Sequence, residues 1–118
     1  MVRIEQLAQM ALSGDALGLR SQVQDWLGEH PKLANSPAPV SADPTILAVA
    51  AALVELFAER RGESPPPWAA KIGAAPRPIH LVNAARTMRR LRELCEAESP
   101  PSLRRRNLFA PPGFLEFV

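Results

Sequence analysis

Few side chains in this sequence have the types and spacing that covalent or metal chemistry requires. Nucleophilic catalysis needs a nucleophile beside a base that a third group orients, and the candidates are Cys95 with His30 or His80. Cys95 falls on the apolar face of a predicted helix, where cysteine acts as a small hydrophobic residue. Neither histidine has a second metal ligand three or four residues away. We therefore expect no catalytic, cofactor or metal site.

The glycines and the carboxylates support the same expectation. No glycine stands in a strand-to-helix turn before Lys-Ser or Lys-Thr, as a phosphate-binding loop requires. Glu55 and Glu59 form an i, i+4 pair on a predicted helix, and like charges at this spacing are typical of a solvated face. The sequence predicts a protein that is not an enzyme.

Arginine is the residue type with the most uneven distribution. Residues 1–70 carry five basic and eight acidic side chains, whereas residues 71–118 carry nine basic and four acidic ones. Seven arginines, with no lysine among them, lie between positions 86 and 106: Arg86, Arg89, Arg90, Arg92, Arg104, Arg105 and Arg106. Guanidinium groups pair with phosphates of nucleic acids and are also enriched at protein interfaces. These arginines are therefore candidate partner-binding residues for either class of partner.

A predicted helix over residues 79–97 would carry four of these arginines. Its apolar face comprises Leu81, Ala84, Ala85, Met88, Leu91 and Cys95, and Arg86 and Arg90 point away from it. Arg92 falls inside this face. Either its stem packs while the guanidinium reaches solvent, or it pairs with an acid of this chain or of a partner.

Several observations favour a protein over a nucleic acid as the partner. The net charge is only +2, and the arginines lack interleaved aromatic residues. The first two predicted helices resemble a helix-turn-helix, but the second has Arg20 as its only basic residue, against Asp25 and Glu29. A protein-binding module is the favoured function, an arginine-driven nucleic-acid binder is the alternative, and a homo-oligomer stays open.

Aromatic side chains supply candidate anchors for such a partner. Trp68 and the tail residues Phe109, Phe114 and Phe117 are large enough to dominate an interface, although core packing is the alternative for each. Two prolines and a glycine at 111–113 keep the tail from continuing as a helix. A chain end this apolar must be buried, either as a strap across its own helices or in a partner.

The elements that position these residues form one predicted helical domain over residues 1–118. Helical spacing and end motifs predict helices over 4–12, from Asp15 to His30, from Asp43 to Arg61 with Gly62 as its cap, and over 79–97, with a short turn at 68–72. The 13 prolines predict stiff connections. The expected fold is all-α: an irregular bundle of four or five helices with proline-rich connections and an apolar C-terminal strap.

The same features bear on the compartment. The longest apolar run, residues 46–57, is about half the length of a membrane span and contains Glu55, so it predicts a buried helix. The N-terminus does not read as a secretory signal, and the single Cys95 excludes an internal disulfide. We expect a cytoplasmic protein that does not bind membranes.

The stretch Glu98–Leu115, ESPPSLRRRNLFAPPGFL, is similar to the ends of small, mostly uncharacterised bacterial helical proteins. Pro66-Pro67-Trp68 and residues 89–92 add to the resemblance, which covers mainly residues 66–118 and includes no catalytic motif. Some proteins of this kind are similar to partners of nucleotidyltransferase-type toxins in two-gene systems. The resemblance therefore implies an antitoxin-like, regulatory binding role.

Overall fold

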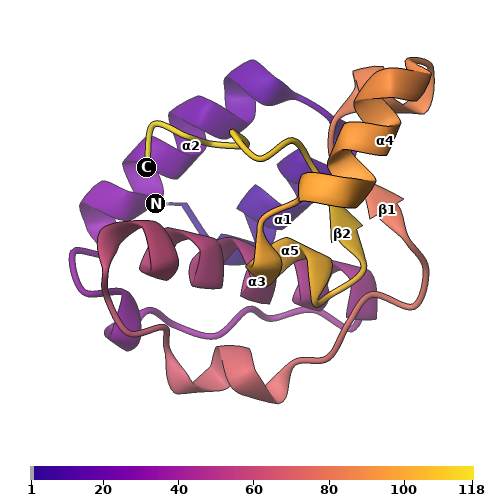
Figure 1. The fold of residues 1–118 in the computed structure, drawn as a ribbon. Coiled ribbons are helices and arrows are strands. Elements are labelled where there is room, and N and C mark those ends of the chain that lie inside the picture. Colours follow the sequence, from indigo (N-terminus) through magenta and orange to yellow (C-terminus); the bar gives the residue numbers. More distant parts are fainter. Residues whose placement is uncertain (1) are drawn as a thin grey trace.

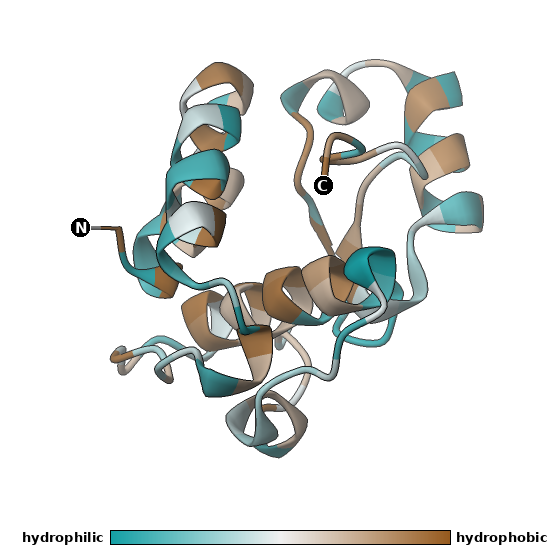
Figure 2. Ribbon diagram, turned by 90° about the vertical axis from the view of Figure 1, so that its left-hand side faces the viewer, coloured by the Kyte–Doolittle hydropathy of each residue, from teal (hydrophilic) through white to brown (hydrophobic). Residues whose placement is uncertain are grey.

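The centre of the fold is a helix that is apolar around most of its circumference. In the computed structural model, which describes residues 2–118, helix α3 spans Pro44–Arg61. The Asp43 carboxylate accepts the N–H of Thr45, and Gly62 ends the helix in the left-handed conformation with a φ of 66°. Residues 48–54 have no exposed surface, and α3 lies among the other elements (Figures 1 and 2). The predicted buried helix and both of its ends are confirmed.

Two further predicted helices form a corner beside α3. Helix α1 spans Ile4–Ser13, helix α2 spans Ala16–Glu29, and α1 packs against both α2 and α3. Gly14, at the corner, has a φ of 80°, which L side chains rarely adopt. Asp15 caps α2 by accepting the N–H of Gly18 at 2.9 Å. Local end motifs therefore predicted this corner correctly.

Short 3-10 helices interrupt the proline-rich connections on either side of α3. They are η1, Leu33–Asn35, and η2, Pro67–Lys71. The second corresponds to the helical turn predicted at residues 68–72. The indole N–H of Trp68 donates to the backbone oxygen of Ser36 at 2.8 Å and ties the two connections together.

The predicted helix over residues 79–97 is wrong in its first half. That half contains the strand β1, Ile79–His80, and the 3-10 helix η3, Asn83–Arg86, while helix α4 is limited to Arg89–Glu98. β1 pairs in parallel with the strand β2, Leu108–Phe109. The backbone N–H groups of residues 79 and 81 donate to the carbonyls of residues 107 and 109. This pairing with a distant segment overrides the local helical spacing.

The chain ends in a short helix and an irregular segment. Helix α5 spans Pro101–Arg104, and residues 111–118, which we call the C-terminal strap, run back across the molecule. The side chains of Phe114, Leu115 and Phe117 pack against the core formed by the helices. Within residues 2–118 the structure has five α-helices, and the predicted all-α class is confirmed. None of these helices is long and apolar enough to cross a membrane.

Candidate functional site

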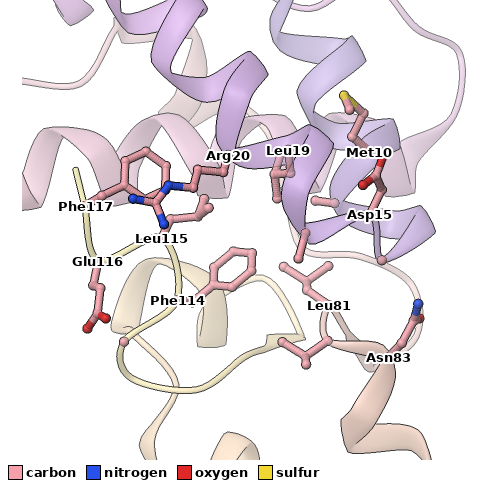
Figure 3. A pocket seen from close by; sticks show the side chains of 15 residues that line it. Met10, Asp15, Leu19, Arg20, Leu81, Asn83, Phe114, Leu115, Glu116 and Phe117 are labelled. Atoms are coloured by element: carbon pink, nitrogen blue, oxygen red, sulfur yellow. The ribbon is translucent and has the colours of Figure 1, made fainter.

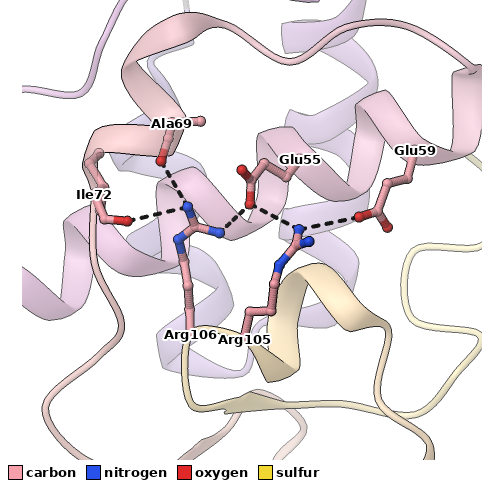
Figure 4. A network of polar contacts seen from close by, with 6 residues as sticks. All are labelled: Glu55, Glu59, Ala69, Ile72, Arg105 and Arg106. Atoms are coloured by element: carbon pink, nitrogen blue, oxygen red, sulfur yellow. Dashed lines mark hydrogen bonds and ion pairs between the residues drawn. The ribbon is translucent and has the colours of Figure 1, made fainter.

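Two of the seven candidate arginines pair with carboxylates of α3, the buried Arg106 and the exposed Arg105 (Figure 4). Arg106 is 7% exposed and donates to the Glu55 carboxylate, to the Ala69 oxygen at 2.8 Å and to the Ile72 oxygen at 3.3 Å. Arg105 contacts Glu55 and a second carboxylate one turn further along α3, each at 3.4 Å. This network fixes the segment after α5 against α3.

The network corrects one sequence expectation. The side chain of Glu55 is 13% exposed, so it does not lie on a solvated face. Glu59, one turn later, is 43% exposed and fits that expectation better. The spacing of Glu55 and Glu59 predicted a solvated face because it gives no sign of their positive partners. These partners are arginines about 50 positions later in the chain. Arg106 is thus committed to its own fold, whereas the ion pairs of Arg105, which is 59% exposed, lie at the surface.

Two more arginines hydrogen-bond backbone carbonyls at the ends of helices. Arg92 donates from Nε to the Ala85 oxygen at 3.1 Å and from Nη2 to the Arg86 oxygen at 2.8 Å, which closes the end of η3. Arg104 donates to the Ala97 oxygen at the end of α4. Arg92 is half-buried, and among the described residues it forms hydrogen bonds to backbone carbonyls and no ion pair with an acid. Its charge satisfies carbonyls that the helix end leaves without donors.

The remaining three arginines project from the outer part of the molecule. Arg86 is the last residue of η3, and Arg89 and Arg90 begin α4, which extends beyond the body at the upper right of Figure 1. Arg89 contacts Glu93 at 3.1 Å, but both side chains are more than half exposed, so this pair contributes little. The side chains of Arg86 and Arg90 form no hydrogen bond or ion pair within residues 2–118.

Large apolar side chains are exposed beside these arginines. Met88 is 56% exposed at the cap of α4, and Leu94 is 37% exposed in the helix. Leu94 lies one turn after Arg90, so both share the outer face of α4. We call Arg86, Met88, Arg89, Arg90 and Leu94 the α4 surface. The inner face of α4 buries Cys95, and this burial raises the pKa of the thiol, an effect to which Glu96 adds.

The charges of α4 oppose its own dipole. Arg89, Arg90 and Arg92 occupy the first turn, where the helix dipole is positive, and the last turn has no basic residue. The N-cap residue, Met88, supplies no side-chain cap. This distribution of charge does not stabilise α4.

The aromatic candidates lie apart from the α4 surface. Trp68 is half-buried between the two connections, and the Phe109 ring lies 5.5 Å from the His80 ring. Phe114 and Phe117 belong to the strap and pack on the core. From the sequence, Met88 is expected on a buried face, and Leu94 is not among the candidate residues. Leu94 could have been identified as exposed, because it directly precedes the inward-facing Cys95 on the helix. The exposure of Met88 could not, because the helix predicted over residues 79–97 placed it on the apolar face.

A pocket of about 280 Å³ lies between the strap and the corner of α1 and α2 (Figure 3). Met10, Leu19, Leu81 and Asn83 form one side of it, and strap residues including Phe114 form the other. We call it the strap pocket. Because its walls come from three segments far apart in the sequence, no local pattern could have predicted it.

Two arginines hold the strap in place over this pocket. Arg60, in the last turn of α3, donates to the backbone oxygens of Leu115 and Pro112. Partial burial lowers the pKa of Arg60, while the neighbouring carboxylates of α3 and the strap oppose this shift. The Arg20 guanidinium lies 5.0 Å from the centre of the Phe117 ring, a cation–π contact. Leu115 has a φ of 53°, so the strap turns sharply there.

The candidate catalytic residues do not form a nucleophile–base pair. Cys95 is buried, the His30 ring lies within 2.8 Å of the Trp26 oxygen, and His80 Nε2 lies 3.3 Å from Glu96. Within residues 2–118, no group of three or more His, Cys, Asp or Glu side chains is arranged to hold a metal ion. Comparison of the chain with models of known protein families, with curated protein sequences and with solved structures found no significant match.

Proposed function

We propose that this chain is a non-enzymatic protein-binding module whose partner docks on the α4 surface. The observation that carries this proposal is the combination of free charge and exposed apolar area in one place. Arg86, Met88 and Arg90 stand together on a projecting part of the fold and have no partner side chain within residues 2–118. Arginine and methionine are enriched at protein interfaces, where exposed apolar side chains become buried.

The charge of the α4 surface indicates the character of the partner. Three arginines favour an acidic surface, and such complementarity sets association rate and specificity more than raw affinity. Met88 and Leu94 require an apolar contact area within that acidic surface. An antitoxin-like role, which the C-terminal resemblance implies, is one form of such stoichiometric binding.

The same helix argues against a nucleic acid as the partner. Of the seven candidate arginines, Arg86 and Arg90 alone have side chains with no hydrogen bond or ion pair within residues 2–118, because the other five contact backbone or carboxylate groups of the chain. The exposed acids Glu93, Glu96 and Glu98 lie on α4 and would repel phosphates. A protein surface tolerates this mixture of charges more readily than a nucleic-acid backbone does.

The test is capture by the tagged full-length chain from its native host, after nuclease treatment and with washes at low and high salt. We expect one stoichiometric protein that is retained by the wild type and lost from Arg86→Glu/Arg90→Glu and from Leu94→Ser. Matched control changes on other exposed positions, Lys32→Glu and Leu17→Ser, should leave capture unchanged. All variants should unfold at the wild-type temperature because these side chains are exposed.

Two results would contradict the proposal. If the captured protein is retained equally by the α4 variants, the docking surface lies elsewhere. If nucleic acid alone is captured without nuclease and salt removes it, the free arginines bind phosphates.

A further inference from the structure

Hydrogen-bond acceptors gather at one end of the strap pocket. Asp15 uses Oδ1 to cap α2, and its Oδ2 has no hydrogen bond within residues 2–118. Asn83 donates from Nδ2 to the Ser13 oxygen at 3.5 Å, and its Oδ1 accepts no hydrogen bond from the described residues. In Figure 3, Asp15 and Asn83 lie on the same side of the pocket.

The helix that ends beside these acceptors adds to the negative potential. α1 ends at Ser13, and its last turn contains no basic residue. The carboxyl end of a helix carries a partial negative charge that a nearby cation stabilises. The start of α2 at the same corner carries the opposite partial charge, but the full charge of the Asp15 carboxylate outweighs it, so this side of the strap pocket is favourable for a positive charge.

No cation of the chain occupies this place among the described residues. Arg20 is the one basic side chain that lines the pocket, and its guanidinium lies over Phe117. Figure 3 shows it directed away from Asp15, on the other side of Leu19. The structure therefore contains no ion pair between Arg20 and Asp15, and the acceptor end of the pocket keeps its charge.

Between this end and the charged side chains of Arg20 and Glu116, the pocket is lined mainly by apolar side chains. Leu19 and Leu81 are 3% and 4% exposed and form its floor, and the Phe114 ring lies against the space that they enclose. An apolar cavity of about 150 Å³ in another protein is large enough to bind benzene. A pocket of about 280 Å³ therefore has room for a ring and a short chain.

We propose that the strap pocket binds a ligand with an apolar body and a protonated amine. The apolar body lies between Leu81 and Phe114, and the amine lies at the end of the pocket that Asp15 and Asn83 line, where the Asp15 carboxylate attracts it. This chemistry is shared by a free arylalkylamine and by a lysine side chain of a partner protein. The site is separate from the α4 surface and does not depend on the proposed docking there.

The first experiment is an NMR titration of the labelled full-length chain with three probes of similar shape. They are 2-phenylethylamine, the neutral 2-phenylethanol and the anionic phenylacetate, at millimolar concentration. We expect the amine to bind about threefold more tightly than the alcohol, as one solvent-accessible charge pair allows, and phenylacetate to bind most weakly. The shifted amides should be those of Gly14, Leu81 and Phe114, which line the pocket.

Two variants test which groups select the amine. Asp15→Asn keeps an N-cap side chain, so α2 and the unfolding temperature should be preserved while the preference for the amine over the alcohol disappears. Asn83→Asp adds a second carboxylate and should tighten amine binding by about a further threefold. A peptide, acetyl-Phe-Lys-amide, separates the two sources: tighter binding than that of 2-phenylethylamine assigns a partner's lysine, and weaker binding assigns a small amine.

Three results would overturn the proposal. The first is a preference for phenylacetate or 2-phenylethanol over the amine. The second is an amine preference that survives Asp15→Asn, because the selecting charge would then lie elsewhere. The third is the absence of shifts at pocket amides with every probe, which would show that the strap pocket binds none of them.

Discussion

Removing the Glu55 carboxylate should destabilise the protein more than any other single change of an acidic side chain that we consider. Glu55→Ala leaves the Arg106 guanidinium, 7% exposed, without its counter-ion. Breaking a buried pair in this way costs about 3–5 kcal/mol. Arg106 keeps its hydrogen bonds to two backbone oxygens of the η2 region, so we expect the lower end, about 3 kcal/mol.

Urea unfolding followed by circular dichroism measures this cost. With a slope of about 1.5 kcal/mol per M, a loss of about 3 kcal/mol lowers the midpoint by about 2 M. Glu59→Ala is the matched control, because Glu59 lies one turn later on α3, is 43% exposed and contacts the exposed Arg105. We expect that control to cost about 0.5 kcal/mol or less.

A double replacement separates the charge pair from packing. Glu55→Leu with Arg106→Met removes both charges, and replacing buried ion pairs by apolar side chains is often neutral or stabilising. The double variant should recover at least half of the loss, since only the carbonyl partners of Arg106 stay unsatisfied. The reasoning is refuted if Glu55→Ala costs no more than Glu59→Ala, or if the losses of the two single replacements simply add.

Three further changes test the corner, the inner face of α4 and the strap. Gly14→Ala and Gly62→Ala should each cost about 1–2 kcal/mol in urea unfolding, because both glycines have positive φ. The new Cβ at position 14 would also meet the exposed Asn83 amide, which can move away at little cost, so a loss at either position well below about 1 kcal/mol would contradict the strained backbone. Burial raises the pKa of the Cys95 thiol, so its contribution to stability is present below the unfolded pKa of about 8.5 and is lost as the pH rises above it. The free energy of unfolding, measured against Cys95→Ala, should therefore fall in alkaline buffer, and parallel pH profiles would be inconsistent with a buried thiol. Arg60→Met should lower stability by about 1–2 kcal/mol and speed hydrogen exchange of the strap amides, because two strap carbonyls lose their donor; unchanged exchange would show that apolar packing alone holds the strap.

Several elements were predictable because their causes are local. Gly14 and Asp15 mark the corner of α1 and α2, and Asp43 and Gly62 mark the ends of α3. A capping side chain or a positive φ acts within one turn of the chain, so neighbouring residues are sufficient to recognise it. The apolar circumference of α3 likewise indicated that other elements surround it.

The segment that failed, residues 79–88, has a cause that lies elsewhere in the chain. Its apolar residues do follow helical spacing. However, its backbone forms hydrogen bonds with residues 107–109, and nothing in the sequence shows that these two segments lie side by side. Short apolar runs are compatible with strand and helix alike, and a tertiary pairing decides between them. The consequence for the site is that Met88 is exposed.

The amino-acid sequence by itself determined the helical class, the boundaries of three helices, the apolar strap and the concentration of arginine in the later half of the chain. Only the tertiary structure decided what each arginine does. Arg106 pairs with a carboxylate 51 positions earlier, whereas Arg90 meets solvent, and nothing in their immediate neighbours distinguishes them. Ion pairs and pockets depend on which distant segments meet, and that is set by the packing of the whole core around α3.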